Sequence, residues 1–510
     1  MLVAAICLYM VFTVGIGLYA SRRVSGAKDF MIAGRSLPLY MNFACVFATW
    51  FGAETVLAIS ATFTKDGLSG ISGDPFGAAM CLMIVALFFA RVFYRMDLLT
   101  IGDFYHKKYG KVVEVITSLA ITISYLGWTS AQMTALGLVT YVLGNSDLTI
   151  QQLSANPHIS LNTSILLGAV IVTIYTLFGG MWSVALTDLV QTAAIVIGLL
   201  IVAYFIGIEA GGVSNVIQTA RQDGKFQLFP TGGTKDWLIF IAAFLTFALG
   251  SIPQQDVFQR VTSAKNENTA VIGTLSGGIF YFFFAFVPMF IAYAAVVIDP
   301  NYKDLFASED SREIQQILPH LILQKTPVWV QILFFGALLS AILSTASGAL
   351  LAPASLFTEN VLQPFMTRLS DRTLLWSVRS VLLLFSLIAT LIALNSTSTM
   401  YEMVQNAYKV TMVAAFVPLA MGVFWKRAST QGALFSIVLG VGVWVFFETM
   451  IGWQSPSDSD SPYALVPAQL CGLIGSFVGM VAGSTLPQWI PQAIVNDEKL
   501  ASKPRTSVGH

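Results

Sequence analysis

Three hydroxyl side chains lie close together in an otherwise apolar stretch of the sequence. Ser344, Thr345 and Ser347 occur within "GALLSAILSTASGALLAPASLFTEN". Hard cations such as Na⁺ prefer clustered oxygen ligands, so these hydroxyls, together with free backbone carbonyls, offer the chemistry of a sodium site. The alternative is that the hydroxyls bond to carbonyls of their own helix or pack small against small with a neighbouring helix. This stretch alone favours neither interpretation.

A carboxylate between two long apolar runs is the second unusual feature. Asp188 lies in "GGMWSVALTDLVQ", residues 179–191, and Thr187 and Gln191 share its helical face. An ionised side chain inside a bilayer costs roughly 2.5 to 3.5 kcal/mol on insertion scales. Either this carboxylate lines an ion path, or it lies at a helix N-terminus, where first-turn N–H groups and the helix dipole satisfy it.

The composition identifies the environment of these groups as a membrane. Of the 510 residues, 56% are hydrophobic and 11% are charged, and the mean hydropathy is +0.74. The formal net charge is zero, which provides no basic face and excludes nucleic acid as a partner. The four cysteines show no CxxC spacing and no pairing with histidine, so neither a disulfide framework nor a zinc site is expected.

Thirteen apolar stretches are about long enough to cross a bilayer as helices, which need roughly 18 residues or more. They lie near 2–20, 40–64, 76–96, 113–144, 161–179, 183–208, 236–258, 270–297, 328–357, 376–396, 403–424, 430–451 and 463–487. An odd number of spans places the two termini on opposite sides. Most of the 27 lysines and arginines fall on the inner side if the N-terminus is outside. We therefore expect an all-α protein of the cell membrane, with one transporter domain at 1–490 and a cytoplasmic tail at 491–510.

Two of the predicted spans are interrupted near their middle. The second, "FACVFATWFGAETVLAIS", contains Gly52 and Glu54, and the seventh, "FLTFALGSIPQQDVFQR", contains Gly250 and Pro253. Each begins a set of five spans, about 40–208 and 236–424, and an odd number of spans makes the two sets inverted. Paired broken segments in inverted halves indicate the midplane site of a transporter. The alternative is that Gly and Pro merely kink these helices.

Several stretches resemble one known family. "YTLFGGMWSVALTDLVQ" is similar to the signature of the sodium/solute symporter family, and "DFMIAGRSLP", "FQRVTSAKN" and "FVPLAMGVFWKR" agree with it in order along the chain. This resemblance implies a leucine-transporter-like core of two inverted five-helix repeats, with one helix before it and two after. It also implies inward symport of a small polar organic solute, driven by the Na⁺ gradient.

The resemblance also implies which groups bind the driving ion. Family members hold Na⁺ between the unwound part of the first core helix and the eighth core helix. In this sequence those groups are the carbonyls of Ala48, Phe51 and Ala341 and the hydroxyls of Ser344 and Thr345.

Some family members bind a second Na⁺ nearer the cytoplasm. Here the corresponding groups are Asp188, Ser344 and Ser347, but Gly348 stands where those members carry one more hydroxyl. The resemblance therefore assigns Asp188 and Ser347 either to a second Na⁺ or to the sodium exit path.

The stretches "ATWFG", "LFFA", "GDFYHKKYGK" and "GSIPQQDVFQRV" resemble the choline-transporter-like clade of this family. Trp50 and Trp128 match two tryptophans of an aromatic cage, which holds a quaternary ammonium by cation–π attraction. Gln254 stands where the clade has a third tryptophan, and Ala78 where it has a tyrosine. We therefore expect a solute that needs hydrogen bonds as well as an apolar contact.

Five polar side chains are candidates to supply those hydrogen bonds: Glu54, Gln132, Gln254, Gln255 and Lys409. Glu54 and Lys409 have a second interpretation as a buried structural pair, because intramembrane charges usually face a partner.

Asp256 and Arg260 lie one turn apart, and their spacing predicts a structural or gating salt bridge.

Other classes of protein fit the sequence less well. A membrane solute sensor of the same fold would carry a signalling module, a channel would need a continuous polar path, and an enzyme would need a catalytic constellation that is absent. Coupling to protons through Glu54 or Asp188 remains open as an alternative to Na⁺. Small-molecule solute, Na⁺ and lipid bilayer are the expected partners, and no obligate protein partner is evident.

Overall fold

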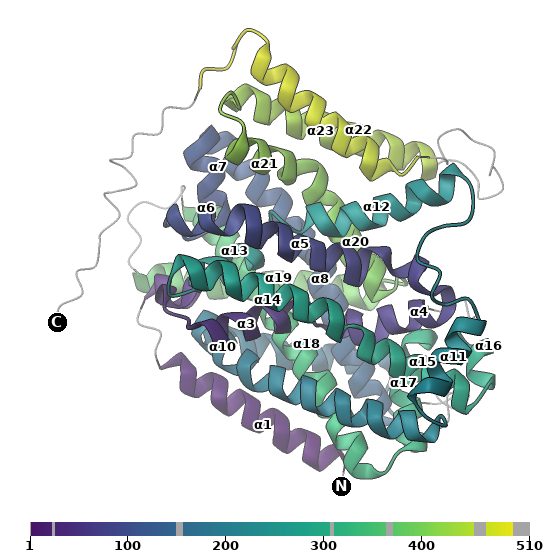
Figure 1. Cartoon of the computed structure of the whole chain (residues 1–510). Helices are drawn as coiled ribbons and strands as arrows, with labels where there is room; N and C mark the ends of the chain where they lie inside the picture. Colours follow the sequence, from purple (N-terminus) through teal and green to yellow (C-terminus); the bar gives the residue numbers. More distant parts are fainter. Residues whose placement is uncertain are drawn as a thin grey trace.

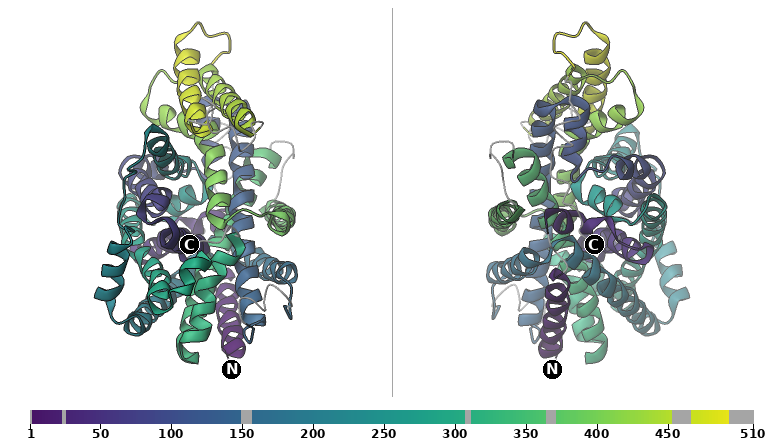
Figure 2. Two further views of the ribbon diagram at one scale, coloured as in Figure 1. Left: turned by 90° about the vertical axis from the view of Figure 1, so that its right-hand side faces the viewer. Right: turned by 90° about the vertical axis from the view of Figure 1, so that its left-hand side faces the viewer.

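The computed structural model describes residues 2–22, 26–148, 157–306, 311–363, 371–452 and 466–492, and these are helical almost throughout. Figures 1 and 2 show long helices stacked side by side, with the chain's N-terminus at one edge. The only extended pairing in the described ranges is an isolated bridge between Leu37 and Ala264. The expectation of an all-α protein is confirmed for this part of the chain.

The first predicted repeat contains a broken helix followed by longer ones. Its helices are α3 (Leu39–Trp50), a π-helical segment (Glu54–Ile59), α4 (Ser60–Asp66), a second π-helical segment (Ser72–Gly77), α5 (Ala78–Ile84), α6 (Ala90–Arg95), α7 (Ile101–Tyr109), α8 (Lys111–Gly144) and α10 (Leu161–Glu209). The two halves of the broken helix meet at a bend of 55°.

The second predicted repeat begins in the same way. Its helices are α12 (Thr234–Gly250), α13 (Gln255–Ser263), α14 (Glu267–Phe284), α15 (Phe286–Ile298), α18 (Val328–Phe357), α19 (Asp371–Asn395), α20 (Met400–Thr411) and α21 (Val417–Phe424). The axes of α12 and α13 differ by 46°. Both interruptions predicted from the sequence are therefore present.

The remaining helices surround this core. They are α1 (Leu2–Ser21), α2 (Ala27–Ile32), α11 (Val213–Gln222), α16 (Asn301–Phe306), α17 (Ser311–Lys325), α22 (Thr430–Gly452) and α23 (Ala468–Thr485). Helices α22 and α23 pack against each other at one edge of the molecule, and α1 lies at the opposite edge against α10 and α18 (Figure 1).

The number of membrane spans is smaller by strict criteria than the thirteen predicted. Nine of the described helices are long and apolar enough to cross a membrane, and up to eleven if each bent pair is one span. The predicted spans at 2–20 and 161–179 coincide with shorter apolar helices, Leu2–Gly17 and Leu161–Ile174. Thirteen spans therefore stays a prediction. Most of the predicted tail, from 493 onward, lies outside the described residues.

A single glycine divides α10. At its 49 residues, this helix would be about 73 Å long if straight, more than twice the hydrocarbon thickness. Gly180 breaks it with φ 58° and ψ −178°, a backbone conformation that favours glycine. A Cβ at this position would lie 2.6 Å from Cδ2 of Phe30. The break falls where the sequence predicts the turn between the fifth and sixth spans.

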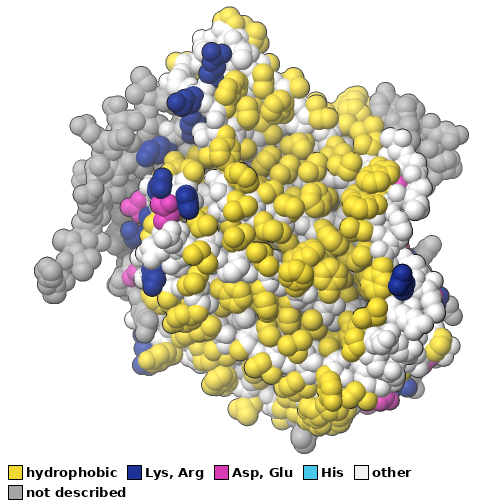
Figure 3. Space-filling view, viewed as in Figure 1, with side chains coloured by type: hydrophobic (Ala, Val, Ile, Leu, Met, Phe, Trp, Pro, Cys, Tyr) yellow, Lys and Arg dark blue, Asp and Glu magenta, His cyan; other side chains and the backbone are white. Residues whose placement is uncertain are grey.

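The outer surface matches a bilayer environment. A broad band of hydrophobic side chains covers the face in Figure 3, and lysines and arginines gather along one edge, at the left of the view. Arg91 and Arg95 both pair with Glu267. A continuous apolar band of this extent is typical of lipid contact, because water-facing surfaces carry far smaller apolar patches.

Candidate functional site

The break in the first core helix releases a backbone carbonyl. Helix α3 ends at Trp50, and the N–H of Gly52 donates to the carbonyl of Trp50 at 3.1 Å. In an uninterrupted helix that N–H would donate to Ala48. The carbonyl of Ala48 instead accepts a hydrogen bond from Oγ1 of Thr345 on α18, at 3.3 Å.

The hydroxyl cluster on α18 faces two other helices. Oγ of Ser344 donates to Oδ1 of Asp188 on α10 at 2.5 Å, and Oγ of Ser347 donates to the carbonyl of Ser344 at 2.9 Å. All of these side chains are fully buried, and Oδ2 of Asp188 has no hydrogen-bond partner. The structure therefore brings Asp188, Ser344, Thr345 and Ser347 together beside Ala48, as the sequence predicts.

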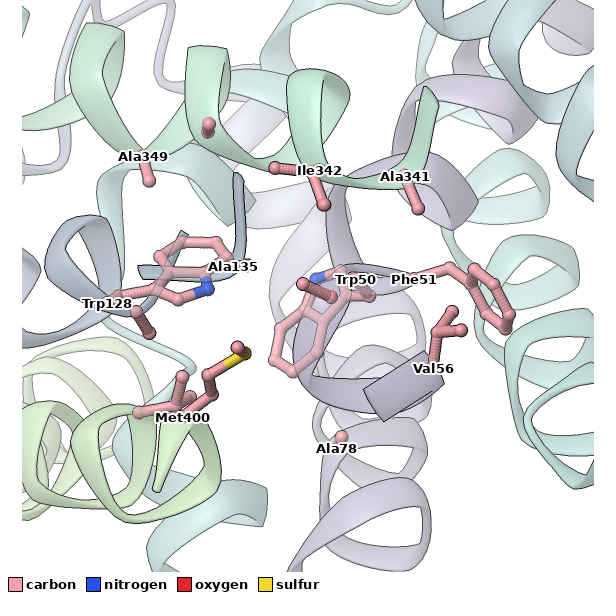
Figure 4. Close-up of a cluster of buried hydrophobic side chains, with 14 of the residues drawn as sticks. Trp50, Phe51, Val56, Ala78, Trp128, Ala135, Ala341, Ile342, Ala349 and Met400 are labelled. Atoms are coloured by element: carbon pink, nitrogen blue, oxygen red, sulfur yellow. The ribbon is translucent and has the colours of Figure 1, made fainter. Parts of the chain in front are cut away.

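The two remaining sodium ligands implied by the resemblance lie in the same region. Figure 4 places Ala341 on α18, next to the segment that carries Trp50 and Phe51, and both Ala341 and Phe51 are fully buried. Among the described residues, no three His, Cys, Asp or Glu side chains gather as they would around a transition metal. Carbonyls, hydroxyls and one carboxylate suit a hard monovalent cation.

The position of Asp188 excludes its interpretation as a helix-capping carboxylate. It lies more than two turns beyond the break at Gly180, whereas unpaired backbone N–H groups are confined to the first turn of a helix. Its partner is a side chain on another helix instead.

A guanidinium occupies the place next to Gly348. A Cβ at Gly348 would lie 2.6 Å from Nη2 of Arg260, so the absence of a side chain there makes room for the arginine. Nε of Arg260 donates to Oγ1 of Thr49 at 2.9 Å and Nη1 donates to the carbonyl of Asp256 at 3.4 Å. No ion pair within 4.0 Å joins the side chains of Arg260 and Asp256; the Asp256 carboxylate instead accepts from the hydroxyl of Tyr125. The predicted salt bridge is therefore replaced by a contact to the backbone.

An aromatic cluster lies on the other side of the broken segment. The ring of Trp50 stacks on that of Tyr408 with centroids 6.2 Å apart, and Trp128 lies 6.3 Å from the same tyrosine. Tyr281 and Phe247 complete the cluster, at 6.4 Å from Trp50 and 5.3 Å from Tyr408 respectively. Figure 4 shows Trp50 and Trp128 approaching each other from different elements, with Ala78 near Trp50. The structure thus brings together the two tryptophans singled out in the sequence.

Three of the five predicted polar residues join this cluster. Glu54 accepts from Nε2 of Gln132 at 2.7 Å and from Nε1 of Trp128 at 3.4 Å. Nε2 of Gln254 donates to Oγ of Ser124 at 3.1 Å. It also donates, at 3.3 Å, to the hydroxyl of Thr411, whose own proton goes to the carbonyl of Gly250 at the break between α12 and α13.

The other two predicted polar residues lie elsewhere. Gln255 accepts at its Oε1 from the N–H of Ile101 at 2.8 Å, so its side chain faces α7. Lys409 is half-buried, and no ion pair within 4.0 Å joins it to Glu54, whose partners are Gln132 and Trp128. Helix α20 turns Tyr408 inward, and a residue one position later points about 100° away.

Asp74 and Tyr281 were not predicted from the sequence, and neither were Tyr408 and Phe247. The buried carboxylate of Asp74 accepts from the hydroxyl of Tyr281, which lies 3.2 Å from Oγ1 of Thr55. Asp74 precedes the third apolar run, and its position before Pro75 in "SGDPFG" is typical of a loop, which hides it from a search for charges within spans. Tyr281 lies within an aromatic-rich run and carries no distinguishing signal.

A cavity of about 650 Å³ lies next to the stacked rings of Tyr401 and Phe247. Its lining comes from α4, the start of α12, α17 and the start of α20, and includes Asp66, Asp236 and Glu402 with one basic residue, Lys65. Tyr401 also lines it, and its ring stacks on that of Phe247 with centroids 5.3 Å apart. The stacked pair separates this vestibule from the rings of Tyr408 and Trp50.

Known proteins are similar to this chain in sequence. The high-affinity choline transporter 1 of Torpedo marmorata is 28% identical over 458 residues, covering 86% of this chain and 75% of that protein. The human high affinity choline transporter 1 is 26% identical, with coverage of 96% and 85%. The sodium/glucose cotransporter of Vibrio parahaemolyticus is 25% identical, with coverage of 87% and 84%.

A solved structure and a family profile extend the comparison. A Na⁺-coupled sialic acid symporter in a substrate-bound outward-open state superimposes with a TM-score of 0.77 at 19% identity, covering 95% of this chain and 98% of that one. This likeness shows that the two chains share a fold. The profile of the sodium:solute symporter family matches residues 30–440. The chain therefore belongs to the sodium:solute symporter family.

Proposed function

We propose that this protein is a Na⁺-coupled symporter that imports a small polar organic solute by alternating access. One observation carries the proposal: the broken segment from Ala48 to Glu54 contributes to both candidate sites. Its start contacts the hydroxyl of Thr345, and its end contacts Gln132 in the aromatic cluster. An ion that orders this segment therefore raises the affinity for the solute, and the solute raises the affinity for the ion by the same factor.

In this proposal the driving Na⁺ binds to neutral oxygens. The ligands are the carbonyls of Ala48, Phe51 and Ala341 and the hydroxyls of Ser344 and Thr345, and the burial of all five supports the assignment. The Na⁺ gradient supplies the free energy for transport. Binding of the ion requires that these oxygens replace its hydration shell.

Asp188 and Ser347 line the exit path of the ion in the same proposal. The unpartnered Oδ2 of Asp188 supports this role, because a buried carboxylate oxygen without a donor attracts a passing cation. The guanidinium of Arg260 beside Gly348 argues against a second resident Na⁺ there, since it already brings positive charge to that place.

The solute lies in the aromatic cluster. Trp50 and Trp128 provide the apolar walls, and Glu54, Gln132 and Gln254 provide polar contacts. The relatives named above for choline and for glucose support a small organic solute of this size class.

We place the N-terminus outside the cell and the C-terminus in the cytoplasm, with residues 1–490 as a single transporter domain. The edge rich in lysine and arginine in Figure 3 supports this orientation. The vestibule then faces the exterior, since it lies at the opposite ends of the helices.

Transport assays in proteoliposomes test the proposal. Labelled choline, betaine, proline, pantothenate, glucose and sialic acid are offered under an inward Na⁺ gradient, and again with K⁺ replacing Na⁺ at several values of pH. Uptake of one solute only with Na⁺ supports the proposal. Uptake that follows a proton gradient without Na⁺ contradicts it and indicates proton coupling.

A further inference from the structure

We propose that the solute is an organic cation that carries N–H hydrogen-bond donors, such as a protonated primary or secondary amine or a guanidinium compound. This inference rests on the transport function proposed above and names the chemical class that the aromatic cluster selects.

The first argument is the balance of buried charge around the cluster. Three buried carboxylates surround the rings: Glu54, Asp74 and Asp256. Among the described residues, Arg260 is the only lysine or arginine in the buried set. Its guanidinium lies beside Gly348 and Thr49 and contacts the backbone of Asp256, so it can balance one of the three carboxylates but not Glu54 or Asp74 as well. Buried carboxylates need a positive partner or protonation. A cationic solute supplies that partner.

The second argument is which polar atoms lack partners. Oε1 of Gln132, Oε1 of Gln254 and Oδ2 of Asp256 are buried with no hydrogen-bond partner in the described part of the chain. Gln254 uses both N–H groups of its amide, on Ser124 and Thr411, and Gln132 uses one of its two on Glu54. The atoms left without any partner at these three groups are all acceptors, and a ligand that donates protons is their complement.

The aromatic rings are consistent with this charge but do not require a quaternary ammonium. Trp50, Trp128 and Tyr408 offer faces for cation–π attraction. The unpaired Oε1 of Gln254 can accept an N–H of a primary or secondary amine, whereas a methyl group would leave it unpaired.

The vestibule supports the same class from outside the cluster. Asp66, Asp236 and Glu402 line it against a single Lys65. A cleft lined mainly by one sign of charge concentrates ligands of the opposite sign and raises their rate of association. The entry path and the site thus both favour a cation.

A methylation series separates charge from hydrogen bonding. Ethanolamine, N-methylethanolamine, N,N-dimethylethanolamine and choline carry the same charge but lose one N–H at each step, and 3,3-dimethylbutan-1-ol is the neutral counterpart of choline. Guanidine, methylguanidine and tetramethylguanidine form a second series. Binding to the purified full-length protein is measured by tryptophan fluorescence with saturating Na⁺.

The expected result is an affinity that falls along at least one series. Loss of donors to charged or buried acceptors predicts a decrease of roughly 10- to 100-fold from the first member to the last, with no binding of the neutral alcohol. Choline binding as tightly as dimethylethanolamine overturns the proposal. Binding of glucose or sialic acid in place of the cations also overturns the proposal. The same holds if no member of either series binds while the protein still binds ²²Na⁺.

Two variants test the residues assigned. Gln254→Met removes the free acceptor and keeps a side chain of similar volume. We expect it to reduce the difference in binding affinity between the first and last members of each series. A merely structural role would weaken all members equally. Gln218→Met, at an exposed position of α11, is the matched control and leaves the series unchanged.

Failure of this inference is distinguishable from failure of the symport function. Binding of donor-rich cations without Na⁺-driven uptake in proteoliposomes refutes symport and leaves the solute class standing. Na⁺-driven uptake of only a neutral or quaternary compound supports symport and refutes the proposed solute class.

Discussion

The proposed sodium site can be tested at one hydroxyl. Replacing Thr345 by valine keeps the shape of the side chain but removes Oγ1, which lies 3.3 Å from the carbonyl of Ala48. A hydrogen bond or ligand contact to a charged group contributes about 1.5 to 3 kcal/mol. At 1.4 kcal/mol per factor of ten, the Na⁺ concentration for half-maximal uptake therefore rises roughly 10- to 150-fold.

The control is Thr345→Ser, which keeps the hydroxyl and loses only the methyl group. Initial rates of uptake into proteoliposomes are measured against Na⁺ concentration for the wild type and both variants. Valine also leaves the buried Ala48 carbonyl without this partner, at a cost of about 1 to 3 kcal/mol, so thermal unfolding is recorded in parallel. A folded valine variant whose Na⁺ activation stays within roughly twofold of the serine variant refutes the assignment of this ligand.

Three further predictions address other parts of the structure. Asp188→Asn removes the charge from the proposed ion path. We expect the maximal uptake rate to fall roughly tenfold, from the loss of about 1.4 kcal/mol of transition-state stabilisation. The half-saturating Na⁺ concentration should change less than in Thr345→Val, and the same rate measurements check both values. Gly180→Ala places a Cβ 2.6 Å from Phe30 at φ 58°. We expect it to lower the free energy of unfolding by about 1 to 3 kcal/mol, seen as a lower melting temperature. Gly336→Ala is the control, because nothing lies within 4 Å of its Cβ, and it should leave the melting temperature unchanged. Burial lowers the pKa of His320 in α17 to about 4, whereas the unfolded segment takes up a proton near the usual pKa of about 6.5. The stability of α17, measured by hydrogen exchange, should therefore fall as the pH falls from about 6.5 to about 4. His320→Phe should remove this pH dependence.

The sequence identifies the cluster of Ser344, Thr345 and Asp188 more readily than the aromatic cluster, for a physical reason. Ser344, Thr345 and Asp188 are polar residues in apolar runs. Polar side chains are rare in membrane spans because they cost free energy in lipid, so these three residues stand out in the sequence. The broken segments are visible for a similar reason, because Gly and Pro interrupt helical periodicity.

The residues of the aromatic cluster are harder to recognise. Tyr281 and Tyr408 belong to a sequence rich in aromatic residues, and only the packing of α14 and α20 selects them. The helical phase of α20 also decides which of two adjacent residues faces the cluster. The sequence predicts Lys409 there, but Tyr408 takes that place. The same applies to Gln255, which faces α7 while Gln254 faces the cluster.

The position of the Arg260 guanidinium against Gly348 bears on how steeply this transporter can concentrate its solute. With that place filled by a fixed positive charge, we expect one Na⁺ per cycle. A monovalent cation entering with one Na⁺ moves two charges inward, which at 100 mV is worth about 4.6 kcal/mol. The membrane voltage alone then supports an accumulation of roughly a thousandfold, multiplied by whatever the sodium gradient adds. A cell using this protein would lose most of its stored solute on depolarisation, even with its sodium gradient intact.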